Sequence, residues 1–125
     1  MRIFITGGAG FIGSHLCEEL YYKIPNSKLL ILDKITYAAN KKFISHILKD
    51  KKRVEFIKAD LIDSKKYQNK IKNFDIAINV AAESHVDRSF NNSILFTKTN
   101  TLGAHIFFSN MFEQQNKKDH SCEYR

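Results

Sequence analysis

One short stretch of the chain, AAESHVDRSF, holds many groups that can bind ligands or transfer protons. Within six positions it has a carboxylate, a hydroxyl, an imidazole, a second carboxylate and a guanidinium, which belong to Glu83, Ser84, His85, Asp87 and Arg88. Such groups can act as acids and bases, and carboxylates with an imidazole can bind a metal. The simpler expectation is that the last three cap the following helix and pair with one another. A metal site is not expected, because an extended or turning segment would not aim its ligands at one point.

A second stretch, GGAGFIG, has the glycine spacing of a loop that binds a dinucleotide. Gly8, Gly10 and Gly13 satisfy GxGxxG, and Gly7 with the last two satisfies GxxGxxG. Glycines permit the tight turn and let the backbone approach a pyrophosphate. The start of the following helix then offers unpaired N–H groups to the phosphates.

An acidic residue lies where a dinucleotide site needs one. Asp33 ends an apolar segment twenty residues after Gly13, and its carboxylate can accept hydrogen bonds from an adenosine ribose. The alternative is an aspartate that only caps a strand end. A carboxylate there also repels a 2′-phosphate, so the sequence predicts NAD rather than NADP, although Lys34 lies beside it.

These groups need a scaffold, and the order of elements predicts an α/β fold with a Rossmann-type, doubly wound parallel sheet. Charges at Glu55 and Lys58 suit an edge strand, and the expected strand order is 3-2-1-4, with a fifth strand next in the complete fold. The domain, residues 1–125, is expected to stop after about four βα units, because its last residues lack the apolar run of a fifth strand. Strands are expected at 2–6, 28–33, 53–61 and 74–82, and helices at 11–23, 41–50, 63–73 and 93–115.

Composition narrows the classes of function. The chain has 125 residues, 43% of them apolar, and a formal net charge of +7. The charge is interpreted as a solvated lysine-rich surface, and no nucleic-acid partner is expected. Without a long apolar run or a signal peptide, the chain is expected in the cytoplasm with no membrane partner. Cys17 and Cys122 do not make a disulfide framework, and neither cysteine nor histidine spacing predicts a metal.

Five motifs, in order, carry a family resemblance. They are TGGAGFIGSHL, DKITYAAN, FIKADLID, AAESHVDRSF and FTKTNTLGA. With them the chain resembles the extended short-chain dehydrogenases/reductases (the NAD-dependent epimerase/dehydratase family) and, within these, the dTDP-glucose 4,6-dehydratases, which are lyases. The first motif is typical of the superfamily, whereas AAESHVDRS is typical of nucleotide-sugar 4,6-dehydratases.

The resemblance implies where NAD would bind. The start of the first helix would meet the pyrophosphate, the segment after the second strand the ribose, and the segment after the third strand the adenine. Ser84 would also turn toward the sugar nucleotide. The implied cofactor residues are Gly7, Gly10, Phe11, Ile12, Gly13, Asp33, Lys34, Ile35, Thr36, Asp60, Leu61, Val80, Ala81, Ala82, Glu83, Ser84 and Thr99.

The resemblance also implies a reaction that these 125 residues cannot perform alone. In the family, NAD oxidises the sugar at C4, water leaves from C6, and the hydride returns to C6. Family members use a Thr-Asp-Glu segment and a Tyr-x-x-x-Lys pair farther along the chain. Tyr37 and Lys41 match the latter only by accident, since they follow the second strand, and Ala39 replaces a glycine usual in that loop. No catalytic residue is therefore expected in this chain.

The expected function is that of the NAD-binding N-terminal part of a dTDP-glucose 4,6-dehydratase, inactive alone. Two alternatives remain: part of a UDP-glucose 4,6-dehydratase, or a non-catalytic NAD-binding or interaction module. The implied partners are a nucleoside-diphosphate sugar and a complementary C-terminal fragment or full-length relative. The family also implies a homodimer.

Overall fold

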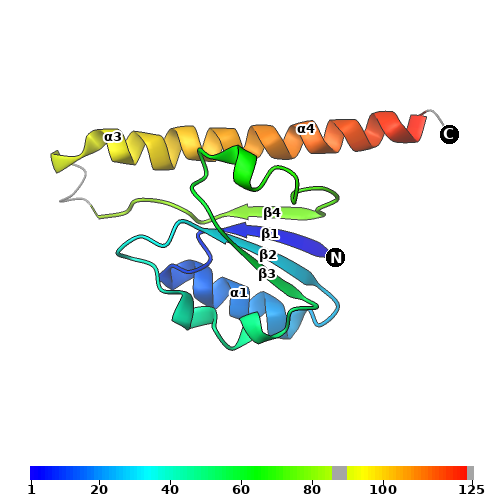
Figure 1. Cartoon of the computed structure of the whole chain (residues 1–125), viewed down its shortest axis with the longest axis horizontal. Coiled ribbons are helices and arrows are strands. Elements are labelled where there is room, and N and C mark those ends of the chain that lie inside the picture. Colours follow the sequence, from blue (N-terminus) through cyan, green and yellow to red (C-terminus); the bar gives the residue numbers. More distant parts are fainter. Residues whose placement is uncertain (86–89, 124–125) are drawn as a thin grey trace.

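The computed structural model describes residues 1–85 and 90–123, with side chains described through residue 117 outside the gap. Four parallel strands form one sheet in the order β3-β2-β1-β4 (Figure 1). This order confirms the predicted Rossmann-type sheet. The strands are β1 (Arg2–Thr6), β2 (Lys28–Asp33), β3 (Val54–Lys58) and β4 (Ile76–Asn79).

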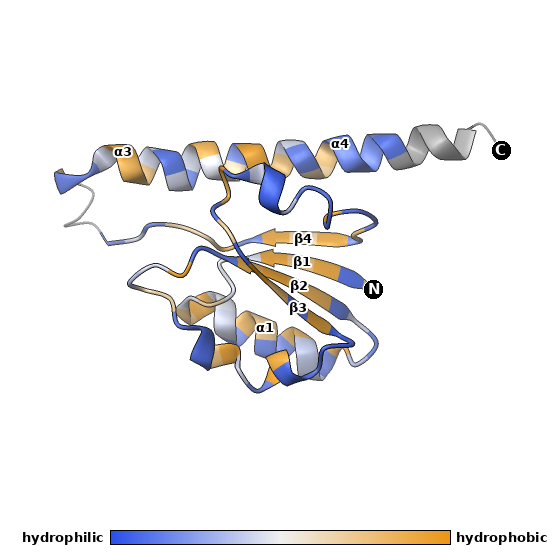
Figure 2. Cartoon of the chain, in the orientation of Figure 1, coloured by the Kyte–Doolittle hydropathy of each residue, from blue (hydrophilic) through white to orange (hydrophobic). Residues whose placement is uncertain are grey.

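Helices cover both faces of this sheet, so its central strands are apolar on both sides. Alternate side chains of β1 point to opposite faces: Ile3 and Ile5 pack in the layer of α1 (Phe11–Lys23), and Phe4 packs with Phe107 in the layer of the C-terminal helix. Figure 2 shows the resulting apolar strands between helices that mix apolar and polar residues. The edge strand β3 has exposed Glu55 and Lys58, as expected.

The last helix is longer and less regular than predicted. It begins as α3 (Ser93–Phe96), continues through a π-helical segment, η4 (Thr97–Gly103), and ends as α4 (Ala104–Glu123). Gly103 lets it approach the loop after β3 closely, because a Cβ there would lie 3.1 Å from Cβ of Leu61. The π segment thus faces the loop that follows β3. Periodicity predicted neither the change of helix type nor the extension past residue 115.

Two predicted helices are wrong. Residues 41–50 form two 3₁₀ turns, η1 (Lys41–Ile44) and η2 (Ile47–Lys49), and residues 63–73 form one, η3 (Ser64–Lys66), followed by turns. Both segments are short and rich in lysine, and each is held by a few buried apolar side chains rather than by a continuous apolar stripe.

The strands β3 and β4 are also shorter than the predicted 53–61 and 74–82. Among the described residues, no helix is long and apolar enough to cross a membrane.

Candidate cofactor-binding site

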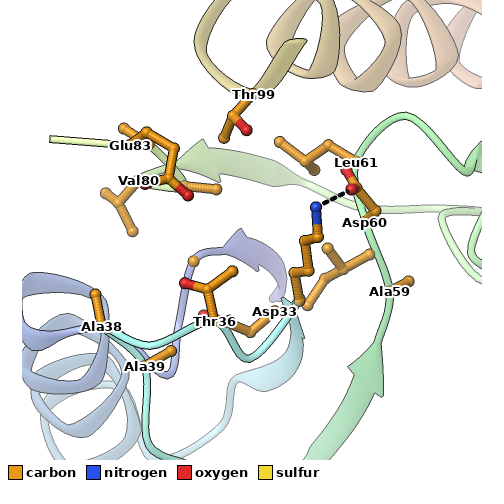
Figure 3. Close-up of a pocket in the computed structure, with 16 residues that line it drawn as sticks. Asp33, Thr36, Ala38, Ala39, Ala59, Asp60, Leu61, Val80, Glu83 and Thr99 are labelled. Atoms are coloured by element: carbon orange, nitrogen blue, oxygen red, sulfur yellow. Dashed lines mark ion pairs between the residues drawn. The ribbon is translucent and has the colours of Figure 1, made fainter. Parts of the chain in front are cut away.

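A pocket that is open to solvent lies at the carboxyl ends of the four strands (Figure 3). All four strands lead into it, and the π segment η4 closes one side through Thr99. The residues that line it are Gly7, Gly10, Leu32, Asp33, Lys34, Thr36, Ala38, Ala39, Ala59, Asp60, Leu61, Val80, Ala81, Ala82, Glu83 and Thr99.

The glycine turn forms the floor of the pocket and leaves space above its backbone. Gly7 has φ +75°, and a Cβ there would lie 2.6 Å from the nitrogen of Ala81. A Cβ on Gly13 would lie 2.0 Å from the oxygen of Gly7, so helix and turn pack backbone to backbone. At Gly10, in contrast, a Cβ would meet only the oxygen of Gly7, at 3.4 Å, among the described atoms. The site therefore has a bare stretch of backbone at Gly10.

The amino end of α1 adjoins this bare stretch. No side chain in the described structure caps this helix, and its first turn has no acidic residue. The first i→i−4 bond runs from the Ser14 N–H to the Gly10 oxygen, at 2.9 Å, so the N–H groups of Phe11, Ile12 and Gly13 precede the ladder. The side chains of Phe11 and Ile12 are exposed. The arrangement fits a pyrophosphate.

The Asp33 carboxylate is buried and fixed. Its Oδ2 accepts a hydrogen bond from the Ala9 N–H at 2.9 Å, and its Oδ1 accepts one from the Ile35 N–H at 2.7 Å. The second bond holds Ile35 at φ 57°, an uncommon conformation for a β-branched residue. Each carboxylate oxygen has two lone pairs, so Asp33 can still accept a hydrogen bond from each hydroxyl of a ribose.

An ion pair spans the far end of the pocket. Lys34 Nζ lies 2.6 Å from Oδ2 of Asp60, shown by the dashed line in Figure 3, and joins the ends of β2 and β3. Next to it, the Leu61 carbonyl accepts a 2.6 Å hydrogen bond from the hydroxyl of Tyr67. Burial, with smaller contributions from Asp60 and Asp63, raises the pKa of Tyr67 to about 12, so its hydroxyl remains a donor.

Two asparagines fix the segment that leaves β4. Asn79 Oδ1 accepts hydrogen bonds from the Thr6 hydroxyl and the Ala81 N–H. Asn100, from η4, accepts from the Glu83 N–H at 2.8 Å and donates to the Glu83 carbonyl at 2.9 Å. Sequence reasoning missed both residues. Their signal was a polar side chain at the end of an apolar strand, and an amide inside the motif FTKTNTLGA.

The Glu83 carboxylate is buried beside the loop that follows β2. It accepts a 3.1 Å hydrogen bond from the Tyr37 hydroxyl, and the ring centroid of Tyr37 lies 5.3 Å from that of His85. Tyr37 therefore packs against the segment after β4. Lys41 instead places its ammonium 4.7 Å from the ring centroid of Phe56. The contacts described for Tyr37 and for Lys41 are thus with different residues.

The structure brings most of the expected cofactor residues into one pocket. The exceptions are the first three residues of α1, which adjoin Gly10, Ile35, which lies after β2, and Ser84, which is exposed beyond Glu83. The three residues of α1 are Phe11, Ile12 and Gly13. Four further lining residues were not predicted: Leu32, Ala38, Ala39 and Ala59.

The expected contacts of Asp87 and Arg88 lie outside the described residues. Among the described residues, no group of three His, Cys, Asp or Glu side chains could hold a metal ion. The pocket combines bare backbone at Gly10, a buried carboxylate at Asp33 and an ion pair between Lys34 and Asp60, which suits an elongated polar ligand with an anionic centre.

Comparison with known proteins places this arrangement in a family. Residues 4–122 match the GDP-mannose 4,6 dehydratase family. The dTDP-D-glucose 4,6-dehydratases of Dictyostelium discoideum and Homo sapiens are 42% and 37% identical over 94% of the chain. A trifunctional UDP-glucose 4,6-dehydratase of Arabidopsis thaliana is 39% identical over 84% of it. The chain spans 27%, 34% and 16%, respectively, of the length of these relatives.

Solved structures share the fold. A dTDP-glucose 4,6-dehydratase from Streptomyces venezuelae, solved with NAD and TYD bound, superposes with a TM-score of 0.84 at 34% identity. The match covers 92% of this chain and 37% of that one. A UDP-glucose 4-epimerase from Stenotrophomonas maltophila, at 24% identity and TM-score 0.78, shares the fold alone. From the family match and these relatives together, the chain belongs to the GDP-mannose 4,6 dehydratase family.

Proposed function

We propose that this chain binds NAD, as the cofactor-binding part of a nucleotide-sugar 4,6-dehydratase. The observation that carries the proposal is the position of the pocket. In the order β3-β2-β1-β4 the chain winds outward from β1 in both directions, and the pocket lies at the carboxyl ends of the strands, at this switch point. Dinucleotides bind at that place in doubly wound sheets. The S. venezuelae relative, solved with NAD, supports the choice of cofactor.

The residues fit the parts of a dinucleotide in order. The bare backbone at Gly10 and the start of α1 would receive the pyrophosphate, and Asp33 would accept hydrogen bonds from the adenosine ribose. Asp60 and Leu61 would border the adenine. The segment 80–84 and Thr99 would border the rest of the cofactor, and Ser84 the sugar nucleotide. When bound, the nicotinamide supplies the hydride acceptor.

The proposed reaction of the complete enzyme converts dTDP-glucose to dTDP-4-keto-6-deoxyglucose. The supporting observation is the 42% identity to the D. discoideum dTDP-D-glucose 4,6-dehydratase. UDP-glucose is the second candidate, because the A. thaliana UDP-glucose 4,6-dehydratase is 39% identical. The 125 residues contain neither Thr-Asp-Glu nor a Tyr-x-x-x-Lys pair near the nicotinamide end, so we propose that they do not turn over substrate alone.

The proposed partners are a nucleoside-diphosphate sugar and a polypeptide that supplies the missing catalytic groups, either a C-terminal fragment or a full-length relative in a homodimer. Co-expression with the part of a full-length dehydratase that follows β4 tests this. Formation of 4-keto-6-deoxy sugar by the mixture supports a split enzyme, whereas NAD binding without turnover supports a non-catalytic module. We place the chain in the cytoplasm, where a free thiol such as Cys17 is normal.

Calorimetric titration with NAD and ADP-ribose tests the proposed binding. We expect similar affinities for the two ligands, because the predicted contacts hold the adenosine and pyrophosphate. Asp33→Asn should weaken both by about 1.5–3 kcal/mol, since it removes a charged hydrogen-bond acceptor. Asp63→Asn removes the same charge outside the pocket and should change neither affinity. Equal affinities in wild type and Asp33→Asn would show that Asp33 does not bind the ribose.

A further inference from the structure

The pocket has an uneven charge distribution. Of the residues that line it in the described structure, Lys34 alone is a cation, whereas Asp33, Asp60 and Glu83 are carboxylates. Lys34 is adjacent to the aspartate expected to bind the ribose. An ammonium at this position could pair with the 2′-phosphate of NADP, which would undo the discrimination made by Asp33.

The structure shows where this ammonium is held. Lys34 Nζ pairs with Asp60 Oδ2 at 2.6 Å, across the pocket end between β2 and β3. Asp60 is itself fixed, because its Oδ1 accepts a hydrogen bond from the Ile62 N–H at 3.2 Å. The side chain of Asp60 is only 26% exposed, whereas that of Lys34 is 48% exposed. Asp60 is therefore the more firmly held member of the pair, and the more exposed Lys34 side chain is the one with room to move.

From this geometry we infer that Asp60 is a specificity-determining residue that holds Lys34 away from a 2′-phosphate and keeps the site selective for NAD. The inference rests on the proposed NAD site and deepens it. Asp33 cannot swing away, because two backbone N–H groups hold its carboxylate, so its repulsion of a 2′-phosphate persists. With Asp60 paired to Lys34, the three side chains together carry one negative charge. Without the Asp60 charge they carry none, and the ammonium is free to move.

The test is a double-mutant cycle of Asp60→Asn and Lys34→Gln, titrated with NAD and with NADP. Asparagine retains an acceptor for the Ile62 N–H, and circular dichroism with thermal melting verifies that each variant folds. We expect Asp60→Asn to lower the ratio of the NADP to the NAD dissociation constant by about tenfold, because one repelling charge is removed and one attracting charge is released. Adding Lys34→Gln should reverse most of this change. Lys34→Gln alone should change the ratio less than about twofold.

Asp63→Asn is the matched control, because Asp63 also pairs with a lysine, Lys66, at 3.1 Å, but does not line the pocket. It should leave the ratio unchanged. An equal loss of NADP affinity on Lys34→Gln in both backgrounds would overturn the inference, since Lys34 would then already be free. If Asp60→Asn binds NAD but has the same ratio of NADP to NAD dissociation constants as wild type, the inference is overturned and the proposed NAD binding stands. If neither wild type nor any variant binds NAD or NADP, both the inference and the proposed function are overturned.

Discussion

At the scale of single residues, the candidate site is fixed by polar side chains that bind backbone groups. Asp33 joins the loop after β2 to the glycine turn at Ala9, and Asn100 joins η4 to the segment after β4. Each such residue joins two segments that are distant in sequence, so the pocket is largely formed before a ligand enters. A preformed pocket lowers the ordering cost of binding.

Cys17 shows how strongly this end of the fold is shielded from water. Burial first, and then the charge of Asp33, raises the pKa of its thiol from 9.0 to about 12. The unfolded thiol therefore ionises at a lower pH than the folded one, and the contribution of Cys17 to stability falls as the pH rises from about 9 to 12. Well below pH 9 the folded and unfolded thiols are both protonated, so Cys17 then makes no pH-dependent contribution to stability.

We expect this thiol to resist alkylation and disulfide exchange in the folded chain. In a Cys122→Ser background, Cys17 should react with a disulfide reagent only at the rate of unfolding at pH 8, and raising the pH to 9.5 should not speed up the native reaction in proportion to hydroxide. The same protein in guanidinium chloride should react quickly and faster at the higher pH. Rapid labelling of the folded protein would contradict the burial of Cys17.

At the scale of elements, two glycines of the turn after β1 have different roles, one in packing and one in the proposed binding of NAD. Gly13 is required by packing, because its Cβ would lie 2.0 Å from the oxygen of Gly7. Gly10 has φ −76° and ψ 176°, which any residue can adopt, and its Cβ would find space. That space is where a pyrophosphate would approach.

The two glycines therefore predict opposite outcomes for the same change. Gly13→Ala should lower the free energy of unfolding by about 1–3 kcal/mol or more, because helix and turn must move apart. Gly10→Ala should leave stability almost unchanged but weaken NAD binding. Urea denaturation and calorimetric titration of both variants check this. A Gly10→Ala variant that binds NAD as well as wild type would place the pyrophosphate elsewhere.

The elements that could be predicted from sequence are those with a long, continuous pattern. The apolar runs of β1 and β2 and the periodic helix α1 have the predicted bounds, 2–6, 28–33 and 11–23. Segments 41–50 and 63–73 were mispredicted as helices, because side chains such as Ile44 and Tyr67 are buried by tertiary packing without a helical stripe. The hydrogen bonds between Asn100 and Glu83 join residues 17 positions apart, and no local sequence pattern predicts such a contact.

The same distinction holds within the site. The glycines and Asp33 could be proposed from sequence because their spacing belongs to one βαβ unit. The Lys34–Asp60 pair depends on how β2 and β3 end side by side. Residues from different loops meet only once the sheet is formed. The family resemblance could therefore suggest that such residues share a site, whereas their spacing in the sequence could not predict which of them touch.

At the scale of the whole molecule, the two edges of the sheet differ. The edge at β3 carries exposed Glu55 and Lys58, and Glu55 pairs with Lys70. The edge at β4 pairs only with β1 among the described strands, and its sequence, IAIN, has no charge. Ile76 on this strand is 41% exposed. Unprotected apolar edges recruit other strands, so β4 is the expected site of self-association.

We expect the 125-residue polypeptide by itself to associate through this edge. Ile76→Lys should shift it toward monomer in sedimentation velocity, because a lysine on an edge strand opposes the approach of a second strand. The matched control is Leu102→Lys, because Leu102 lies on the C-terminal helix and is similarly exposed, at 44%. This control should associate as wild type does. If Leu102→Lys disperses the protein and Ile76→Lys does not, association occurs through the helix, and a partner would have to cover that face rather than extend the sheet. Dispersal by Ile76→Lys alone makes the edge of β4 the place where a complementary strand must add.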